Sequence, residues 1–208
     1  MGCNTLIFRR KDLFCFTKVK GIIFDLDDTL VHANLNFAKI KAAVGCPPNA
    51  DILQYIEKIK CEKTKQKAHE TVLWYELEDA KTSRMIAGAH TFIKQALAHE
   101  LPLAIVTRNC REATQIKLES NDIPIDLVIT REDAPPKPNP EALLNILNQW
   151  QNDLDISSGD LAYIGDYQYD IDAAHNAGMQ AWLFTFNAKH ESYENNLKYI
   201  PKPSQKRV

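Results

Sequence analysis

Five carboxylates fall in two short runs of this 208-residue chain, FDLDDT and GDYQYD. The first run holds Asp25, Asp27 and Asp28, and the second holds Asp166 and Asp170. Carboxylates that share a partly dry cleft repel one another, and their pKa values rise unless a cation lies between them. A hard divalent cation relieves this repulsion, and Mg²⁺ is the common choice at phosphate sites. The two runs together predict a Mg²⁺ site, whereas either run alone could be a solvated acidic turn or a helix cap.

A hydroxyl and an amine could bind the phosphate that such a site serves. Thr107 ends an apolar run just before Arg108 and Asn109, where we expect a helix to begin, and helix N-termini bind anions. Lys137 lies in the run PPKPNP, whose prolines fix the backbone and can aim the lysine. Taken alone, a strand-terminal threonine and an exposed loop lysine are the simpler interpretations of these two residues.

The elements that must position these residues alternate between strands and helices. Short, nearly continuous apolar runs are typical of a parallel sheet covered on both faces, and their alternation with helical patterns predicts a Rossmann-like, open α/β sheet. In such sheets ligands bind beyond the carboxyl ends of the strands, which is where Asp25, Thr107 and Asp166 fall. The expected strands are 19–26, 101–107, 127–130, 161–165 and 180–185, and the expected helices are 89–100, 109–119, 139–150 and 170–177.

The chain between Leu30 and Met85 departs from this alternation. It shows no convincing strand, and the segments 35–44, 51–68 and 69–82 have helical patterns. We therefore expect a small helical insertion, residues 33–85, within an α/β core of residues 1–32 and 86–208. Some aromatic and basic side chains of the insertion could contact the substrate. The simpler interpretation is that the aromatic side chains pack the helices of the insertion and the lysines form a solvated face. The candidates are Tyr55, Trp74, Tyr75, Lys39, Lys41, Lys58 and Lys60.

The four elements, in their order along the chain, resemble those of the haloacid dehalogenase superfamily, whose members are mostly phosphatases with an aspartate nucleophile. The order is DxDxT, then a threonine after a strand, then a lysine, then GDxxxD, and it spans about 19–185. The helical insertion follows the first motif, as the cap domain does in the phosphoglycolate phosphatase and β-phosphoglucomutase relatives. The resemblance implies a cap that closes over the substrate and excludes water.

The resemblance also assigns catalytic and metal-binding roles. Asp25 matches the nucleophile that takes the phosphoryl group, and Asp27 matches the general acid and base. An acid at position 27 favours phosphotransfer over cleavage of a carbon–halogen bond. The implied Mg²⁺ ligands are Asp25, the backbone carbonyl of Asp27 and Asp166, with Asp170 acting directly or through a water.

The implied phosphate contacts come from the two middle elements. Thr107 would hold a phosphoryl oxygen, and Lys137 would neutralise the nucleophile and the phosphate, so both also count as catalytic. Arg108 and Asn109 are further candidate substrate contacts. Two anions, a carboxylate and a phosphate monoester, cannot approach each other until cations screen them, so this division of roles agrees with electrostatics.

The expected activity is Mg²⁺-dependent hydrolysis of a small phosphorylated metabolite through an aspartyl-phosphate. A phosphomutase, which transfers the group instead of releasing it, and a non-catalytic phosphate-binding regulatory protein are the alternatives. A thiol nucleophile at Cys110 has less support, because no histidine stands beside it to activate it.

Composition bounds partners and compartment. A formal net charge of -2 argues against a nucleic-acid surface. The chain has no run of about 18 apolar residues, so we expect no membrane span. The five cysteines form no CxxC pair, so we expect free thiols and a cytoplasmic location. We expect a monomer or weak homodimer. The first 18 residues mix basic and apolar side chains and predict an extra strand or a packed arm.

Overall fold

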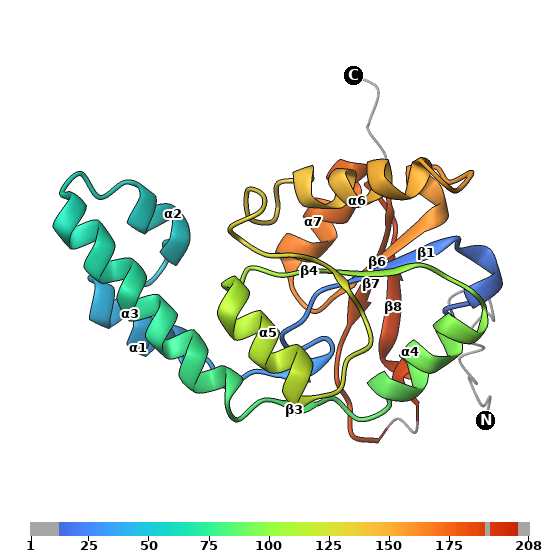
Figure 1. The fold of residues 1–208 in the computed structure, drawn as a ribbon, viewed down its shortest axis with the longest axis horizontal. Helices are drawn as coiled ribbons and strands as arrows, with labels where there is room; N and C mark the ends of the chain where they lie inside the picture. The colour runs from blue at the N-terminus through green and yellow to red at the C-terminus, as the bar shows by residue number, and fades with distance from the viewer. Residues whose placement is uncertain (1–12, 190–191, 204–208) are drawn as a thin grey trace, which may run out of the picture.

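The computed structural model describes residues 13–189 and 192–203, which form a six-stranded sheet flanked by helices, with a group of helices at one side (Figure 1). The strands of the sheet are β1 (Gly21–Phe24), β4 (Leu103–Val106), β5 (Leu127–Ile129), β6 (Leu161–Gly165), β7 (Gln180–Phe184) and β8 (Leu197–Ile200). Their order is β5-β4-β1-β6-β7-β8, in which neighbours are parallel except for the antiparallel pair of β7 and β8. The expected Rossmann-like open sheet is therefore confirmed.

Helices cover both faces of this sheet, which explains the continuous apolar runs. They are α4 (Ala89–Ala98), α5 (Arg111–Ser120), α6 (Glu141–Gln151) and α7 (Gln168–Ala177). Successive side chains of a strand point to opposite faces. In β1, Ile22 and Phe24 pack in a cluster with Phe92 of α4, whereas Ile23 packs in a second cluster with Leu143 of α6. Each such side chain, once fully buried, contributes about 1.5–3 kcal/mol to folding.

The helical insertion consists of α1 (Phe37–Val44), α2 (Ile52–Glu57) and α3 (Glu62–Ala80), which lie beside the sheet in Figure 1. Its helices share a small hydrophobic cluster of their own, which includes Ile40, Ile56 and Val72. Side chains cap the first two helices: Asn36 accepts from the Lys39 amide, and Asp51 accepts from the Gln54 amide, each at 3.0 Å. The insertion thus has the elements of a separate small helical unit.

Two differences from the sequence prediction lie at the edges of this insertion. The prediction that no strand lies between Leu30 and Met85 was wrong. Strands β2 (Val31–His32) and β3 (Arg84–Met85) pair as an antiparallel ribbon where the chain leaves and re-enters the core. Two-residue strands are too short to show a periodic pattern. The break between the helices was misplaced as well, since it falls between Glu57 and Glu62 and leaves α3 continuous through the expected break near residue 68.

Further differences concern element ends. The helix expected from residue 109 begins at Arg111 with Cys110 as its N-cap, and the helix expected from residue 170 begins earlier, at Gln168. The polar tail contains a strand, β8, that the prediction missed. The N-terminal arm is packed over residues 13–18, where Phe14 and Phe16 contact the ring of Phe92; residues 1–12 lie outside the described part. Among the described helices, none is both long and apolar enough to cross a membrane.

Candidate active site

Three neighbouring strands bring the predicted site residues to one edge of the sheet. Strand β1 lies between β4 and β6, so Asp25, Thr107 and Asp166, which follow the ends of these strands, come together. The Asp25 amide donates to the Ile164 carbonyl at 2.8 Å, which extends the ladder up to the acidic residue. These residues line a cavity of about 580 Å³, a volume suited to a small ligand. The other predicted residues that line it are Asp27, Arg108, Asn109, Lys137 and Asp170.

An acidic cluster occupies the floor of this cavity. Carboxylate oxygens of Asp25, Asp166 and Asp170 lie within 4.8 Å of one another. Burial, opposed by Lys137 and reinforced by the neighbouring carboxylates, raises the pKa of Asp25 to about 8, and burial with Asp170 and Asp28 raises the pKa of Asp166 to about 7. A divalent cation would remove this repulsion, and carboxylate oxygens are the ligands that Mg²⁺ prefers. The donor set therefore fits the predicted metal, although Asp27 contributes no side-chain oxygen to it.

Lys137 is buried in the site and not an exposed loop residue. Its side chain is 3% exposed, and its Nζ lies 2.6 Å from an oxygen of Asp25 and 2.6 Å from an oxygen of Asp170. The ammonium also donates to the Val106 carbonyl and the Tyr163 hydroxyl. A buried charge is tolerated when its donors are used in this way. Lys137 therefore supplies a fixed positive charge beside the predicted nucleophile.

Asp170 serves both interpretations of its motif. Its Oδ2 accepts from the Tyr167 amide at 3.0 Å, so it caps the first turn of α7, while its Oδ1 reaches Lys137 and the Tyr163 hydroxyl. Gly165 allows this close packing, because a Cβ at that position would fall 2.6 Å from Asp170 Oδ2. The glycine of the GD motif is therefore required by the side chain five residues later.

The carboxylate of Asp27 is not part of the acidic cluster and is held by two donors. Asn109 Nδ2 donates to its Oδ2 at 3.0 Å, and Lys117 Nζ lies 2.6 Å from its Oδ1. Burial raises the pKa of Asp27, and the neighbouring Lys117 and Asn109 oppose that rise. Asn109, predicted as a substrate contact, is thus engaged with Asp27 through its side chain.

Sequence reasoning missed Lys117. One signal was available: with Cys110 and Ala113 it lies on one stripe of α5, at helical spacing, and both neighbours on that stripe are buried. A lysine at a core position of an amphipathic helix requires a buried anionic partner. The sequence alone does not show which carboxylate that partner is.

Thr107 and Arg108, which follow strand β4, make different contacts at the cavity. Thr107 is buried, and its hydroxyl accepts from the Asn109 amide at 3.2 Å. Arg108 reaches across the cavity to the insertion, where its guanidinium lies 2.5 Å from the Asp51 carboxylate and 4.9 Å from the centre of the Tyr169 ring. Arg108 therefore joins the core to the helical insertion at the cavity.

The insertion contributes different side chains to the cavity from those considered in the sequence. Phe37, Lys41 and Asp51 line it, and of the seven insertion candidates Lys41 alone is among them. Tyr55 and Tyr75 pack against the hydrophobic cluster of the insertion. Lys39, Lys58 and Lys60 are exposed, as the simpler interpretation predicts. Trp74 is also exposed, whereas that interpretation predicts that it packs within the insertion.

Cys110 is a structural residue and not a nucleophile. Its side chain is buried and caps α5 by accepting from the Ala113 amide. Burial, reinforced by Glu76, raises the pKa of the thiol to about 11, so the reactive thiolate is scarce near neutral pH. Cys110 also lines a different hollow from the one that contains Asp25.

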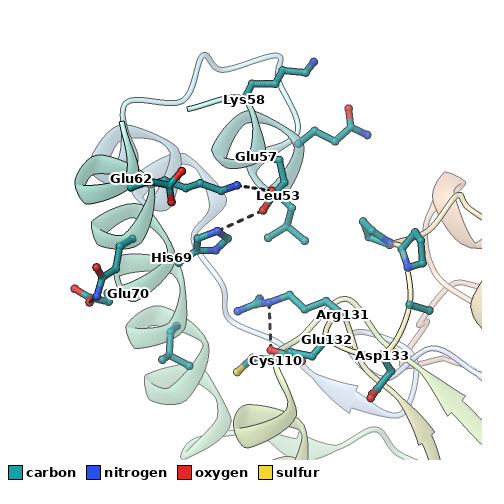
Figure 2. A pocket seen from close by; sticks show the side chains of 17 residues that line it. Leu53, Glu57, Lys58, Glu62, His69, Glu70, Cys110, Arg131, Glu132 and Asp133 are labelled. Carbon is teal, nitrogen blue, oxygen red and sulfur yellow. Dashed lines mark hydrogen bonds and ion pairs between the residues drawn. The ribbon is translucent and has the colours of Figure 1, made fainter. Parts of the chain in front are cut away.

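Figure 2 shows that second hollow, which lies between the insertion and the loop that follows β5. Charged side chains dominate it, and several of them are paired: Glu57 binds both Lys65 and His69, and Arg131 binds Glu132 and, beyond the hollow, Glu76. None of the residues at the ends of β1, β4 and β6 lines it. The chemistry predicted from the sequence therefore belongs to the other cavity.

Comparisons with known proteins agree with the fold. Residues 32–184 match the model of the haloacid dehalogenase-like hydrolase family. A haloacid dehalogenase-like hydrolase domain-containing protein of Arabidopsis thaliana is 28% identical over 180 residues, which cover 81% of this chain and 70% of that protein.

Solved structures show the same fold. A predicted phosphoglycolate phosphatase from Haemophilus somnus has a TM-score of 0.61 at 22% identity, over 79% of this chain and 84% of that one. A structure described as a candidate β-phosphoglucomutase from Thermotoga maritima has a TM-score of 0.57 at 18% identity, over 83% and 88%. With the family match over about three quarters of its length, this chain belongs to the haloacid dehalogenase-like hydrolase family and is a hydrolytic enzyme.

Proposed function

We propose that this hydrolase is a Mg²⁺-dependent phosphatase that releases phosphate from a small phosphorylated metabolite. The observation that carries the proposal is the cavity itself, which holds a buried acidic cluster, the ammonium of Lys137 and the separate carboxylate of Asp27. A phosphate monoester needs positive charge around its oxygens, a nucleophile and a proton donor for its leaving group. The cavity offers all three within a volume that a small metabolite can fill.

In the first step, an oxygen of Asp25 attacks phosphorus, and the bond between phosphorus and the ester oxygen breaks. The product is an aspartyl-phosphate and an alcohol. Asp27 donates the proton that the departing oxygen needs, and burial supports this role because it raises the pKa of the Asp27 carboxyl. Lys137 lies 2.6 Å from Asp25 and stabilises the negative charge as the two anions meet.

In the second step, Asp27 has lost its proton and accepts one from a water molecule. That water attacks phosphorus, the bond to Asp25 breaks, and inorganic phosphate leaves. The Thr107 hydroxyl, which lies at the end of β4 beside the start of α5, would donate to a phosphoryl oxygen in both steps. The same two carboxylates therefore complete the cycle and return to their starting states.

The metal would be held by Asp25, Asp166 and the backbone carbonyl of Asp27, with Asp170 in support. When bound, Mg²⁺ would screen the charge of the substrate phosphate and of Asp25. In this chain Lys137 also pairs with Asp170, so a single positive charge faces two of the three clustered carboxylates.

The helical insertion would act as a cap over this cavity. We place the boundary at residues 33–85, because β2 and β3 mark where the chain leaves and re-enters the core. The Arg108–Asp51 ion pair joins the two parts at the cavity, as a cap contact would. The four described cysteines, which have no disulfide partner, suit a cytoplasmic enzyme, and we expect a monomer or weak homodimer.

The test is hydrolysis of p-nitrophenyl phosphate by the purified chain. We expect phosphate release with Mg²⁺, loss of release after full chelation, and loss of release in Asp25→Asn, which keeps the size of the side chain but cannot form an acyl phosphate. Asp172→Asn, within α7, is the control and should retain activity; the Asp172 carboxylate accepts from the Gln168 side chain. Wild-type activity that survives full chelation, or activity that remains in Asp25→Asn, would contradict the proposal.

A phosphomutase would give a different result in the same assay. It would release phosphate slowly and would interconvert sugar phosphates rapidly, because its phosphoryl group returns to a substrate hydroxyl. Rapid interconversion with slow release would therefore replace the phosphatase by the mutase, whereas binding of phosphate without turnover would support the regulatory alternative.

A further inference from the structure

Lys117 is a fully buried ammonium that the steps above do not use. It lies in the last turn of α5 with 0% of its side chain exposed. Its Nζ lies 2.6 Å from Asp27 Oδ1 and 2.7 Å from Asp79 Oδ2. A buried charge is stable only when its partners are close, so both carboxylates are needed where they are. Lys117 thereby joins the loop after β1 to the last turn of α3.

Asp79 lies where both connections between the core and the insertion meet. It belongs to the helix that leads back to the core, and its Oδ1 accepts from the amide of Asn34 at 2.6 Å. Asn34 belongs to the connection that leads out of the core, between β2 and α1. The side chain of Asp79 is 3% exposed. Any rotation of the insertion about these connections must therefore move Asp79 or break its contacts.

Asp27 has little freedom of its own. Lys117 holds one of its oxygens, and Asn109 holds the other at 3.0 Å. Both holding residues come from the segment that follows β4, so the direction of the Asp27 carboxylate depends on α5. The chain of contacts from Asn34 through Asp79 and Lys117 to Asp27 is continuous and buried for most of its length.

We propose that Lys117 is a positioning residue that couples the hinge of the insertion to the carboxylate of Asp27. The inference rests on the proposed function, in which Asp27 protonates the leaving group. Lys117 is not among the residues that line the cavity, and it is not part of the acidic cluster. Its effect on the reaction would pass through the direction of Asp27.

The test compares two phosphate esters of similar shape, p-nitrophenyl phosphate and phenyl phosphate. The p-nitrophenolate ion leaves without help, whereas the more basic phenolate needs a well-placed proton donor. In Lys117→Met, we expect kcat/KM for phenyl phosphate to fall at least about tenfold more than for p-nitrophenyl phosphate, because positioned proton transfer contributes about 10²–10⁴-fold. Lys117→Arg, which keeps the positive charge, should recover part of the loss.

Asp79→Asn tests the coupling and does not depend on the folding of Lys117→Met. It leaves Lys117 beside Asp27 and keeps an oxygen for the Asn34 amide, but removes the charge at the hinge. We expect the same substrate-selective loss. Gln115→Met, on the exposed side of α5, should change kcat/KM for neither ester, and it controls for the effect of altering the helix itself.

Three results would overturn the inference. Equal losses on both esters in Lys117→Met and Asp79→Asn would mean that Lys117 only stabilises the fold. A selective loss in Lys117→Met, with the kcat/KM values of Asp79→Asn unchanged, would mean that the hinge is not coupled to Asp27. Wild-type protein that hydrolyses neither ester would contradict the proposed function itself, and the inference with it.

Discussion

Asp25, Asp166 and Asp170 are three acids placed where repulsion between them is strong. Lys137 pairs with Asp25 and Asp170, but burial still raises the pKa of Asp25 to about 8 and that of Asp166 to about 7. Folded protein without metal therefore holds protons that the unfolded chain has lost near neutral pH, since an ordinary aspartate ionises near pH 3.8. The stability of the metal-free protein should fall as pH rises from about 3.8 to about 8, because over this range the native state binds more protons than the unfolded state.

Metal binding should show the opposite trend. Because protons and Mg²⁺ compete for the same oxygens, we expect the increase in Tm caused by Mg²⁺ to grow between about pH 6 and about pH 8.5. Thermal unfolding at matched Mg²⁺ concentration and after chelation measures this increase. Asp166→Asn should reduce it at every pH. An increase in Tm that is as large at the acidic end as at the alkaline end would contradict this account of the cluster.

Helix α2 contacts the core through the residue that caps it. Asp51 accepts from the Gln54 amide and from Arg108. Burial alone would raise the pKa of Asp51, but these hydrogen bonds outweigh it and lower that pKa, so the carboxylate stays charged at neutral pH. One side chain therefore both begins a helix of the insertion and holds that helix against the cavity wall.

Arg108→Ala should weaken substrate binding more than it slows chemistry. A hydrogen bond to a charged group contributes about 1.5–3 kcal/mol, so we expect KM to rise about tenfold or more while kcat changes less. Steady-state kinetics with p-nitrophenyl phosphate measures both constants. Arg111→Ala is the matched control, because Arg111 lies three residues later and pairs with Asp133 at the surface, where an ion pair contributes little. An unchanged KM in Arg108→Ala would show that the pair has no part in the site.

At the scale of the whole molecule, the rule that parallel strands end at one edge explains most of what the sequence could predict. Asp25, Thr107 and Asp166 were found because each follows an apolar run, and the order of neighbouring strands then brings them together. The contacts made by the insertion could not be found in this way. Lys117 with Asp79, and Arg108 with Asp51, depend on how α2 and α3 pack against the core, which no local pattern specifies.

The missed short elements have a related cause. Strands β2 and β3 contain two residues each, so pairing between distant segments defines them and periodicity does not. Strand β8 is the antiparallel edge of the sheet, and its two middle residues, Lys198 and Tyr199, are exposed, so it gives a weaker signal than a continuous apolar run. The fold class was therefore predictable, whereas the edges of the sheet and the hinge of the insertion required the structure.

Asp25 is the residue proposed to carry the phosphoryl group, and capture of that group tests this role most directly. The protein would be mixed with p-nitrophenyl phosphate and Mg²⁺, quenched in acid, and reduced with borohydride, which converts an aspartyl-phosphate into homoserine. Peptide mass spectrometry then locates the change. We predict homoserine at position 25 and none at position 27 or 166. Turnover without homoserine at position 25, or with the phosphoryl group trapped on another residue, would contradict the account.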